Sequence, residues 1–142
     1  MGSPSTMAPE QAAGKLGLVS TATDVYGLGT ILYQLLTGYL PFKGDNAAEL
    51  IQKVLYVEAT DPRSLNPVVD HDLAAICITC LEKEPSTRYA SAEALLRDLR
   101  HWLNNEPIEA RPITLRIRMT KWVKRSPAIA ALSVALVLAS VR

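Results

Sequence analysis

The segment 21–38, TATDVYGLGTILYQLLTG, restricts the possible folds more than any other part of the chain. Its apolar residues recur at helical spacing, at Val25, Leu28, Leu32, Leu35 and Leu36. Ile31 and Tyr33 make part of the opposite side apolar as well, and a helix that is apolar nearly all round has to be surrounded by other elements. The segment is therefore predicted to be the central helix of a domain, ending at Gly38.

Three further helices are predicted, in the segments 46–59, 70–85 and 86–105. The first has Asn46 as N-cap and Glu49 three residues later, which is typical of a capping box. The second is expected to end at Pro85, and the third to begin after Ser91 as N-cap. The predicted buried faces comprise Leu73, Ile76, Cys77, Cys80 and Leu81, and Leu95, Leu96, Leu99, Trp102 and Leu103. With no credible pair of strands, the fold class is mainly α.

Charge divides the chain into two regions. All 14 acidic residues lie in residues 1–110, together with 8 of the 15 basic ones, whereas residues 111–142 hold 7 basic residues and no acidic one. At 142 residues, the chain can bury one modest core. The two regions are therefore expected to have different surroundings or partners.

The segment 128–141 is uncharged and apolar. As a helix it would be about 21 Å long at ~1.5 Å per residue, shorter than the ~30 Å hydrocarbon core of a bilayer. Three interpretations stay open: a truncated transmembrane helix, an interfacial helix, or a helix of a soluble core. The basic residues before it favour the first, which would place residues 1–126 in the cytosol.

The basic segment 111–125 is expected to contact membrane lipids, and residues 111–141 together form the predicted lipid-binding part. Its position beside an apolar run makes anionic headgroups a better partner than nucleic acid, which is not expected. A solvated charged face is the alternative. The residues proposed to flank the membrane are Arg116, Arg118, Lys121, Trp122, Lys124 and Arg125.

Three motifs in order, GSPSTMAPEQ, TDVYGLGTILYQLLTGYLPF and LEKEPSTRYASAEALLRDL, resemble the C-terminal lobe of a protein kinase domain. The resemblance is to the bacterial, membrane-anchored Ser/Thr kinases and covers residues 2–104. It implies a helical C-lobe portion of the kinase-like fold in residues 1–106, a basic juxtamembrane linker in 107–126 and a truncated transmembrane helix in 127–142. It also implies a location at the inner membrane, with the kinase portion in the cytoplasm.

The resemblance implies a buried, bidentate ion pair between Glu10 of the APE motif and Arg88 of EPSTRY. Such a pair would tie the end of the activation segment to the rest of the lobe. The alternative is two solvated surface charges, which contribute little to stability.

Two further features would serve the catalytic centre of a kinase. Asp24, at the start of the central helix, corresponds to a carboxylate that accepts hydrogen bonds from the catalytic loop, although the helix dipole alone could explain it. Gly2, Ser3 and Pro4 match the substrate-side loop, in which the hydroxyl group approaches the catalytic aspartate. For Ser3 the alternative is an ordinary serine near a chain terminus.

The loop and helix in residues 38–50 correspond to a region with which kinases dock substrates or partners. Leu40 and Phe42 are candidates for an exposed docking anchor, but a buried residue that clamps the loop is the competing interpretation for them. A non-catalytic, membrane-anchored docking module that uses residues 40–50 is accordingly the alternative function.

Phosphoryl transfer requires a glycine-rich cover, a strand lysine, a catalytic aspartate and a metal-binding aspartate, and this sequence holds none of these motifs. ATP and Mg²⁺ are therefore expected to bind only in the intact parent kinase, which would phosphorylate protein substrates, and the chain alone is expected to be inactive. Cys77 and Cys80 are predicted to pack in the core, because the pair lacks the other ligands of a zinc site.

The part of a kinase that normally covers the central helix is expected to be missing. Its absence should leave apolar area exposed at Val25, Leu28, Leu32 and Leu36. The soluble part of the chain is therefore expected to be loosely packed or aggregated when isolated.

Overall fold

The computed structural model describes residues 4–110 and 127–140. They belong to two compact units, Met1–Pro112 and Ile113–Arg142, which are described separately. Within the described residues all regular structure is helical, which confirms the predicted class.

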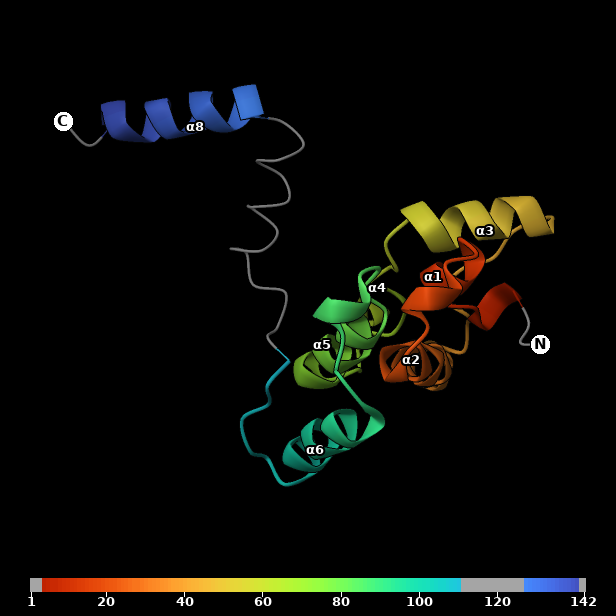
Figure 1. Cartoon of the computed structure of the whole chain (residues 1–142). Coiled ribbons are helices and arrows are strands. Elements are labelled where there is room, and N and C mark those ends of the chain that lie inside the picture. The colour runs from red at the N-terminus through yellow and green to blue at the C-terminus, as the bar shows by residue number, and fades with distance from the viewer. Residues whose placement is uncertain (1–3, 111–126, 141–142) are drawn as a thin grey trace. The chain divides into compact units, whose positions relative to one another are not determined.

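In residues 4–110, the described part of the first unit, there are six α-helices and three short 3₁₀ turns (Figure 1). The helices are α1 Pro9–Ala12, α2 Thr21–Thr37, α3 Ala47–Tyr56, α4 Pro62–Leu65, α5 His71–Cys80 and α6 Ala92–Leu103. The 3₁₀ turns are Pro4–Thr6, Leu16–Leu18 and Pro85–Thr87. The four predicted helices correspond to α2, α3, α5 and α6, while the single turns α1 and α4 were not predicted because they lack an apolar period.

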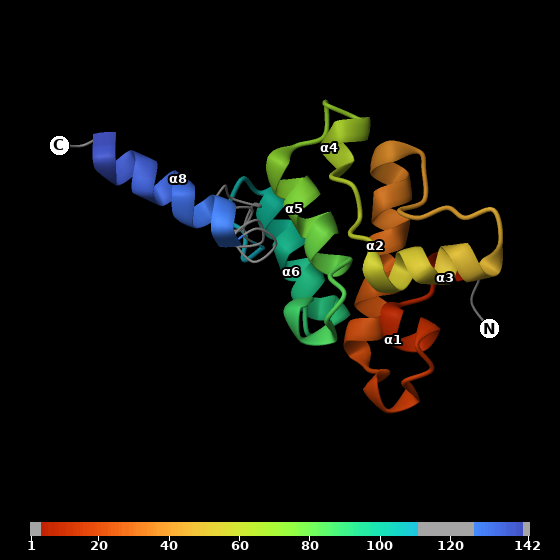
Figure 2. The same cartoon turned by 90° about the horizontal axis from the view of Figure 1, so that it is seen from above.

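Helix α2 is central to the unit, as predicted, and contacts α4, α5, α6 and two of the 3₁₀ turns. Helices α5 and α6 lie along one side of it, whereas α3 packs on α1 and the first 3₁₀ turn and not directly along α2 (Figures 1 and 2). The Ser20 hydroxyl caps α2 by accepting the Ala22 N–H. Gly38 ends the helix in the left-handed region at φ 80°, a conformation that costs glycine least.

The core lies where α2, α5 and α6 meet. Val25 of α2, Ile76 and Cys80 of α5 and Leu95 of α6 are buried together there. A second cluster joins Ala8, Tyr26, Tyr33, Cys77 and Leu81. Both cysteines are fully buried, which confirms their predicted packing role, and burial raises the pKa of the Cys80 thiol to about 12.

Helices α2 and α5 are in close contact at Gly29. A Cβ atom added to this glycine would lie 2.5 Å from the Cys80 Cβ and 3.2 Å from a Leu81 methyl carbon. The Cys77 thiol also lies 3.7 Å from the Gly29 carbonyl oxygen, within reach of a weak hydrogen bond. The absence of a side chain at Gly29 therefore sets the distance between the two helices.

The helix termini and faces depart from the prediction in three places. Asn46 caps α3 by accepting the Glu49 N–H, but the Glu49 carboxylate accepts from Asp45 N–H rather than from Asn46. Helix α5 ends at Cys80, before Pro85, because the chain turns at Leu81. Leu96 and Leu103, predicted to be buried, are 44% and 68% exposed.

In the second unit, helix α8 spans Pro127–Ser140. Its apolar side chains, among them Leu132, Leu136 and Leu138, are exposed within this unit. The predicted apolar helix is therefore present. None of the helices in the described part of the chain has the length and apolar character needed to cross a bilayer.

Candidate functional site

Glu10 and Arg88 form the predicted buried ion pair. Glu10 lies in the first turn of α1, and Arg88 lies directly after the 3₁₀ turn Pro85–Thr87. One terminal nitrogen of Arg88 lies 2.8 Å from Glu10 Oε1, and the other lies 2.8 Å from Oε2. The two residues are only 3% and 6% exposed. The contact is thus bidentate and shielded from water, and the alternative of two solvated charges is wrong.

The Arg88 guanidinium uses all five of its N–H groups. Beyond the two bonds to Glu10, it donates to the carbonyls of Ala22 at 3.1 Å, Glu82 at 2.7 Å and Lys83 at 3.1 Å. Because an arginine has five donors in a fixed planar arrangement, none is left unsatisfied here. One side chain therefore joins α1, the start of α2 and the loop after α5.

Thr23 extends this arrangement, and the three residues Glu10, Thr23 and Arg88 are called the clamp below. The Thr23 hydroxyl donates to Glu10 Oε1 at 2.7 Å and accepts the Ser20 N–H at 3.0 Å. The sequence prediction missed this partner. The spacing Ser20-x-x-Thr23 at the start of a helix is the signal that could have indicated it.

The electrostatics of the clamp favour its charged form. Burial by itself would raise the pKa of the Glu10 carboxyl group, but the hydrogen bonds from Arg88 and Thr23 and the positive charge outweigh burial and hold the pKa below its usual value. The Arg88 guanidinium also lies over the Tyr26 ring, 5.0 Å from its centre. The clamp is therefore a pre-organised structural contact, with no free group left for proton transfer.

Asp24 differs from Glu10 in its surroundings. It lies in the first turn of α2, is exposed, and makes no hydrogen bond or ion pair with the other residues that the structure describes. Its carboxylate is free to accept hydrogen bonds from another segment. Of the predicted substrate-side loop, Pro4 begins the first 3₁₀ turn, while Gly2 and Ser3 lie outside the described residues.

Phe42 is buried, at 5% exposure, and Leu40 is half-buried. The Lys83 ammonium lies 4.3 Å from the centre of the Phe42 ring and donates to the Val54 carbonyl at 2.6 Å, at the end of α3. Burial lowers the pKa of Lys83 to about 8. Phe42 is thus buried against Lys83, which in turn binds α3, and it is not an exposed docking anchor.

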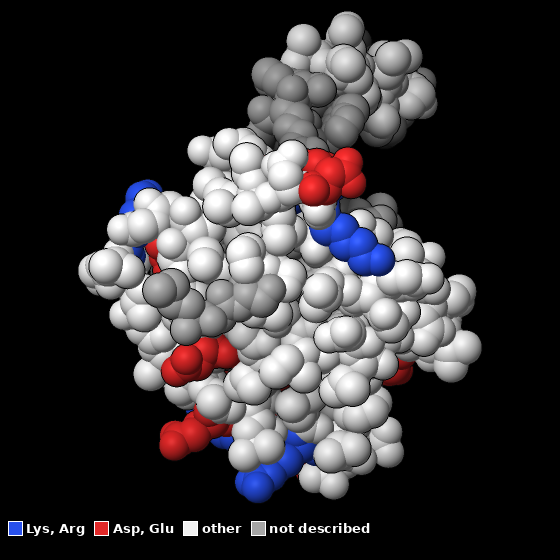
Figure 3. Space-filling view, turned by 90° about the vertical axis from the view of Figure 1, so that its right-hand side faces the viewer, with Lys and Arg blue, Asp and Glu red and all other residues white. Residues whose placement is uncertain are grey.

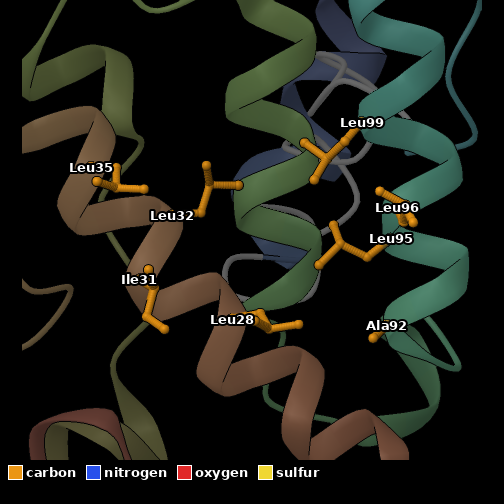
Figure 4. A pocket seen from close by; sticks show the side chains of 8 residues that line it. All are labelled: Leu28, Ile31, Leu32, Leu35, Ala92, Leu95, Leu96 and Leu99. Atoms are coloured by element: carbon orange, nitrogen blue, oxygen red, sulfur yellow. The ribbon is translucent and has the colours of Figure 1, made fainter.

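An apolar groove of about 330 Å³ lies between α2 and α6 (Figure 4). Leu28 and Leu32 on α2 point toward Leu95 and Leu99 on α6, with α5 behind them in this view. The lining residues are Leu28, Ile31, Leu32, Leu35, Ala92, Leu95, Leu96 and Leu99.

The exposed side of α2 comprises Asp24, Leu28, Ile31 and Leu35 and is called the open face below. Leu28, Ile31 and Leu35 are 41%, 55% and 79% exposed. These residues recur at intervals of three and four, so they share one side of the helix. The prediction of exposed apolar area is confirmed at Leu28 but is wrong at Val25, which is completely buried in the core cluster with residues of α5 and α6. Leu32 and Leu36, predicted to be exposed as well, are half-buried.

Charged residues are dispersed on the face of the molecule shown in Figure 3. Basic and acidic side chains alternate there and do not form a patch of one sign. The six predicted membrane-flanking residues, Arg116 to Arg125, lie outside the described residues. Among the residues that the structure does describe, no group of three or more His, Cys, Asp or Glu side chains could hold a metal ion.

The sequence profile of the protein kinase domain matches residues 1–99. Over 116 residues the chain is 32% identical to the serine/threonine-protein kinase PrkC of Bacillus subtilis, covering 82% of this chain and 18% of the relative. Over 110 residues it is 34% identical to the serine/threonine-protein kinase PknB of Mycobacterium tuberculosis, covering 78% and 17%. Over 95 residues it is 39% identical to the DNA damage-responsive serine/threonine-protein kinase RqkA of Deinococcus radiodurans, covering 67% and 14%.

The chain belongs to the protein kinase family. Its relatives are bacterial serine/threonine kinases, and it corresponds to a part of such a kinase. It spans less than a fifth of the length of these relatives.

Proposed function

We propose that residues 1–110 form the helical C-terminal section of the C-lobe of a Ser/Thr protein kinase. In the intact parent, the γ-phosphate of ATP would pass to hydroxyl groups of protein substrates. This section would supply the substrate-side loop, the central helix α2 and the clamp that ties the two together. The open face of α2 is the observation that carries the proposal, since it presents a free carboxylate above an uncovered apolar stripe.

The open face has the chemistry of a surface that another section of the kinase domain covers. Leu28, Ile31 and Leu35 would pack against an apolar helix, because each fully buried leucine or isoleucine contributes about 1.5–3 kcal/mol. Asp24 would accept backbone N–H groups of the catalytic loop, as the family resemblance implies. The residues of α6 that line the groove would form the second wall of the site in which this apolar helix packs.

Among the residues that the structure describes, no group of acidic side chains fits a Mg²⁺ site for ATP. The Glu10 carboxylate is fully engaged by Arg88 and Thr23, and Asp24 is a single exposed carboxylate. We therefore infer that nucleotide and metal bind to other sections of the parent and that the chain alone is inactive.

A chimera tests this role. In it, residues 4–110 of this chain replace the matching section of the kinase domain of PknB. We expect the chimera to transfer labelled phosphate from ATP to a generic protein substrate, and the chain alone to show neither transfer nor thermal stabilisation by nucleotide. Changing Asp24 to alanine or Leu28 to lysine in the chimera should reduce phosphate transfer at least tenfold, because both residues lie on the open face.

The control for this experiment is Leu103→Lys, which changes an exposed leucine outside the groove and should leave phosphate transfer within twofold. Phosphate transfer by the chain alone would contradict the proposal. So would a folded chimera without activity, or one in which Leu28→Lys has no more effect than Leu103→Lys.

We further propose that residues 111–141 attach the kinase to the inner membrane, with residues 1–110 in the cytoplasm. The uncharged helix α8 and the run of basic residues before it support this proposal. A basic residue near an anionic membrane surface contributes about 1 kcal/mol to binding. The parts of the chain would accordingly be a kinase section, a basic linker and a membrane-attached helix.

Co-sedimentation with phosphatidylglycerol vesicles tests the attachment. Changing Arg116, Arg118, Lys121, Lys124 and Arg125 to glutamine should weaken vesicle binding by the full chain at least tenfold. The matched control changes five basic residues outside this segment, Lys15, Lys43, Lys53, Arg97 and Arg100, to glutamine and should leave binding within twofold. Equal binding by both variants would contradict a role of the basic segment at the membrane.

The docking-module alternative depended on an exposed anchor in residues 40–50. Because Phe42 is buried against Lys83, no observation favours this function over the kinase role.

A further inference from the structure

The chain reverses its direction at the end of α6. The N–H of Glu106 donates to the His101 carbonyl at 2.8 Å, and the N–H of Asn105 donates to the Trp102 carbonyl at 3.2 Å. Asn105 lies in the left-handed region at φ 55°. These contacts define a Schellman motif, in which asparagine takes the place of the usual glycine. Residues 106–110 therefore leave the helix terminus and run back beside α6.

Asp98 holds the returning segment in place. Its carboxylate accepts the N–H of Glu109 at 2.8 Å and the N–H of Ala110 at 2.8 Å. The Tyr89 hydroxyl donates to the same carboxylate at 2.6 Å. Asp98 is 1% exposed, and Ala110 is 6% exposed within the main core cluster.

The segment is also part of the hydrophobic core. Ile108 packs against the core cluster, so the compact unit extends beyond residue 106, the expected boundary. A charge buried to this degree is stable only when hydrogen bonds replace its hydration. Burial alone would raise the pKa of Asp98, but the Tyr89 hydroxyl and the two N–H groups lower it below the usual value. His101 lies 3.7 Å from the same carboxylate.

We propose that Asp98 is an anchor that fixes the start of the basic segment, through residues 109–110, to helices α1–α6 (Pro9–Leu103), which are called the kinase unit below. The basic segment begins one residue later, at Arg111. With the anchor in place, whatever binds the basic segment is joined to the kinase unit at a fixed point. Without it, residues 105–110 could extend by ~3.3–3.6 Å each, which adds roughly 20 Å of free tether.

Amide hydrogen exchange in the full chain tests the anchor. Changing Asp98 to asparagine removes one acceptor oxygen and places an NH₂ group against N–H donors. We expect exchange at Glu109 and Ala110 to accelerate at least tenfold, with a similar acceleration of Glu-C cleavage between these two residues. The amides of α2 should keep their protection within threefold, which separates release of the segment from unfolding.

Two further variants keep the test decisive. Tyr89→Phe removes one hydrogen bond of Asp98 but leaves both acceptor oxygens for the segment, so exchange at residues 109–110 should stay within threefold. Asn105→Val strains the exposed left-handed position and should release the segment without disturbing the buried carboxylate, whereas Asn105→Gly should not. Unchanged exchange at 109–110 in Asp98→Asn would overturn the proposal, as would equal acceleration in Tyr89→Phe. Because these contacts lie within residues 89–110, the result is independent of what the basic segment binds.

Discussion

Changing Arg88 to lysine should lower the free energy of unfolding of the kinase unit by about 3–5 kcal/mol. A lysine ammonium can reach one of the five acceptors of Arg88 well, but it lacks the planar group that engages both oxygens of Glu10. The Glu10 carboxylate and three backbone carbonyls would be left buried with too few donors. Against a total stability of about 5–15 kcal/mol for a typical domain, this loss is severe. Urea denaturation of the full chain measures it.

The matched control is Arg97→Lys, which changes an exposed arginine of α6 and should alter the stability by less than 0.5 kcal/mol. Glu10→Gln should be destabilising as well, since it keeps the shape of Glu10 but removes its charge. Similar effects of Arg88→Lys and Arg97→Lys would show that the clamp contributes little.

The stability that the ion pair between Glu10 and Arg88 confers should depend on pH. Because the pKa of Glu10 is lower in the folded chain than in the unfolded one, the stability it confers is present above pH ~4.5 and is lost as the pH falls through the folded pKa. Asp98 has a lowered pKa too and titrates in the same direction. The difference in the free energy of unfolding between the wild type and Glu10→Gln should therefore shrink as the pH is lowered. A difference that does not change with pH would exclude this linkage between protonation and stability.

Changing Gly29 to alanine should destabilise the kinase unit by about 1–3 kcal/mol. The new methyl group would lie 2.5 Å from the Cys80 Cβ, so α2 and α5 would have to move apart. This cost exceeds the roughly 1 kcal/mol that alanine gains over glycine inside a helix. Thermal or urea unfolding of the full chain measures the change, and Gly29→Val should have a larger effect.

Gly27→Ala is the control on the same helix. No atom lies within 4 Å of a Cβ placed there, so only the helix propensity changes and the stability should rise by about 0.5–1 kcal/mol. A loss of stability in Gly29→Ala and a gain in Gly27→Ala would establish that contact with α5, rather than helix propensity, decides the effect at Gly29. A stabilising Gly29→Ala would refute the close approach.

The elements with strong periodicity could be predicted from the sequence. The bounds of helix α2 were predicted to within a residue, because its apolar residues recur at helical spacing and Gly38 ends the helix. The Ser91 cap of α6 could be predicted for a similar reason, since the Ser91 hydroxyl accepts the N–H of Ala94, only three residues further along the chain. Local signals of this kind depend only on residues within one turn.

Contacts between distant segments could not be derived from periodicity. The pairing of Glu10 with Arg88, 78 residues apart, came from the family resemblance. The role of Asp98 was not foreseen, because an acidic residue on an amphipathic helix is normally assigned to the solvated side. Its burial depends on the reversal at Asn105, which periodicity does not indicate.

The exposure of leucines on α6 was mispredicted for a physical reason. Leu96 belongs to the same apolar face as Leu95, but it lies over the groove and has no covering element among the described residues. Periodicity reports which side of a helix is apolar, and the exposed fraction depends on what packs there.

The two fully buried thiols give the kinase unit a built-in chemical probe. Cys77 and Cys80 are 0% exposed and lie beneath α2, and burial raises the pKa of both thiols. Thiolate is the form that reacts with alkylating reagents, so the native unit should be almost inert to iodoacetamide. The labelling rate would then report how often α2 separates from α5, without any added fluorophore or tag.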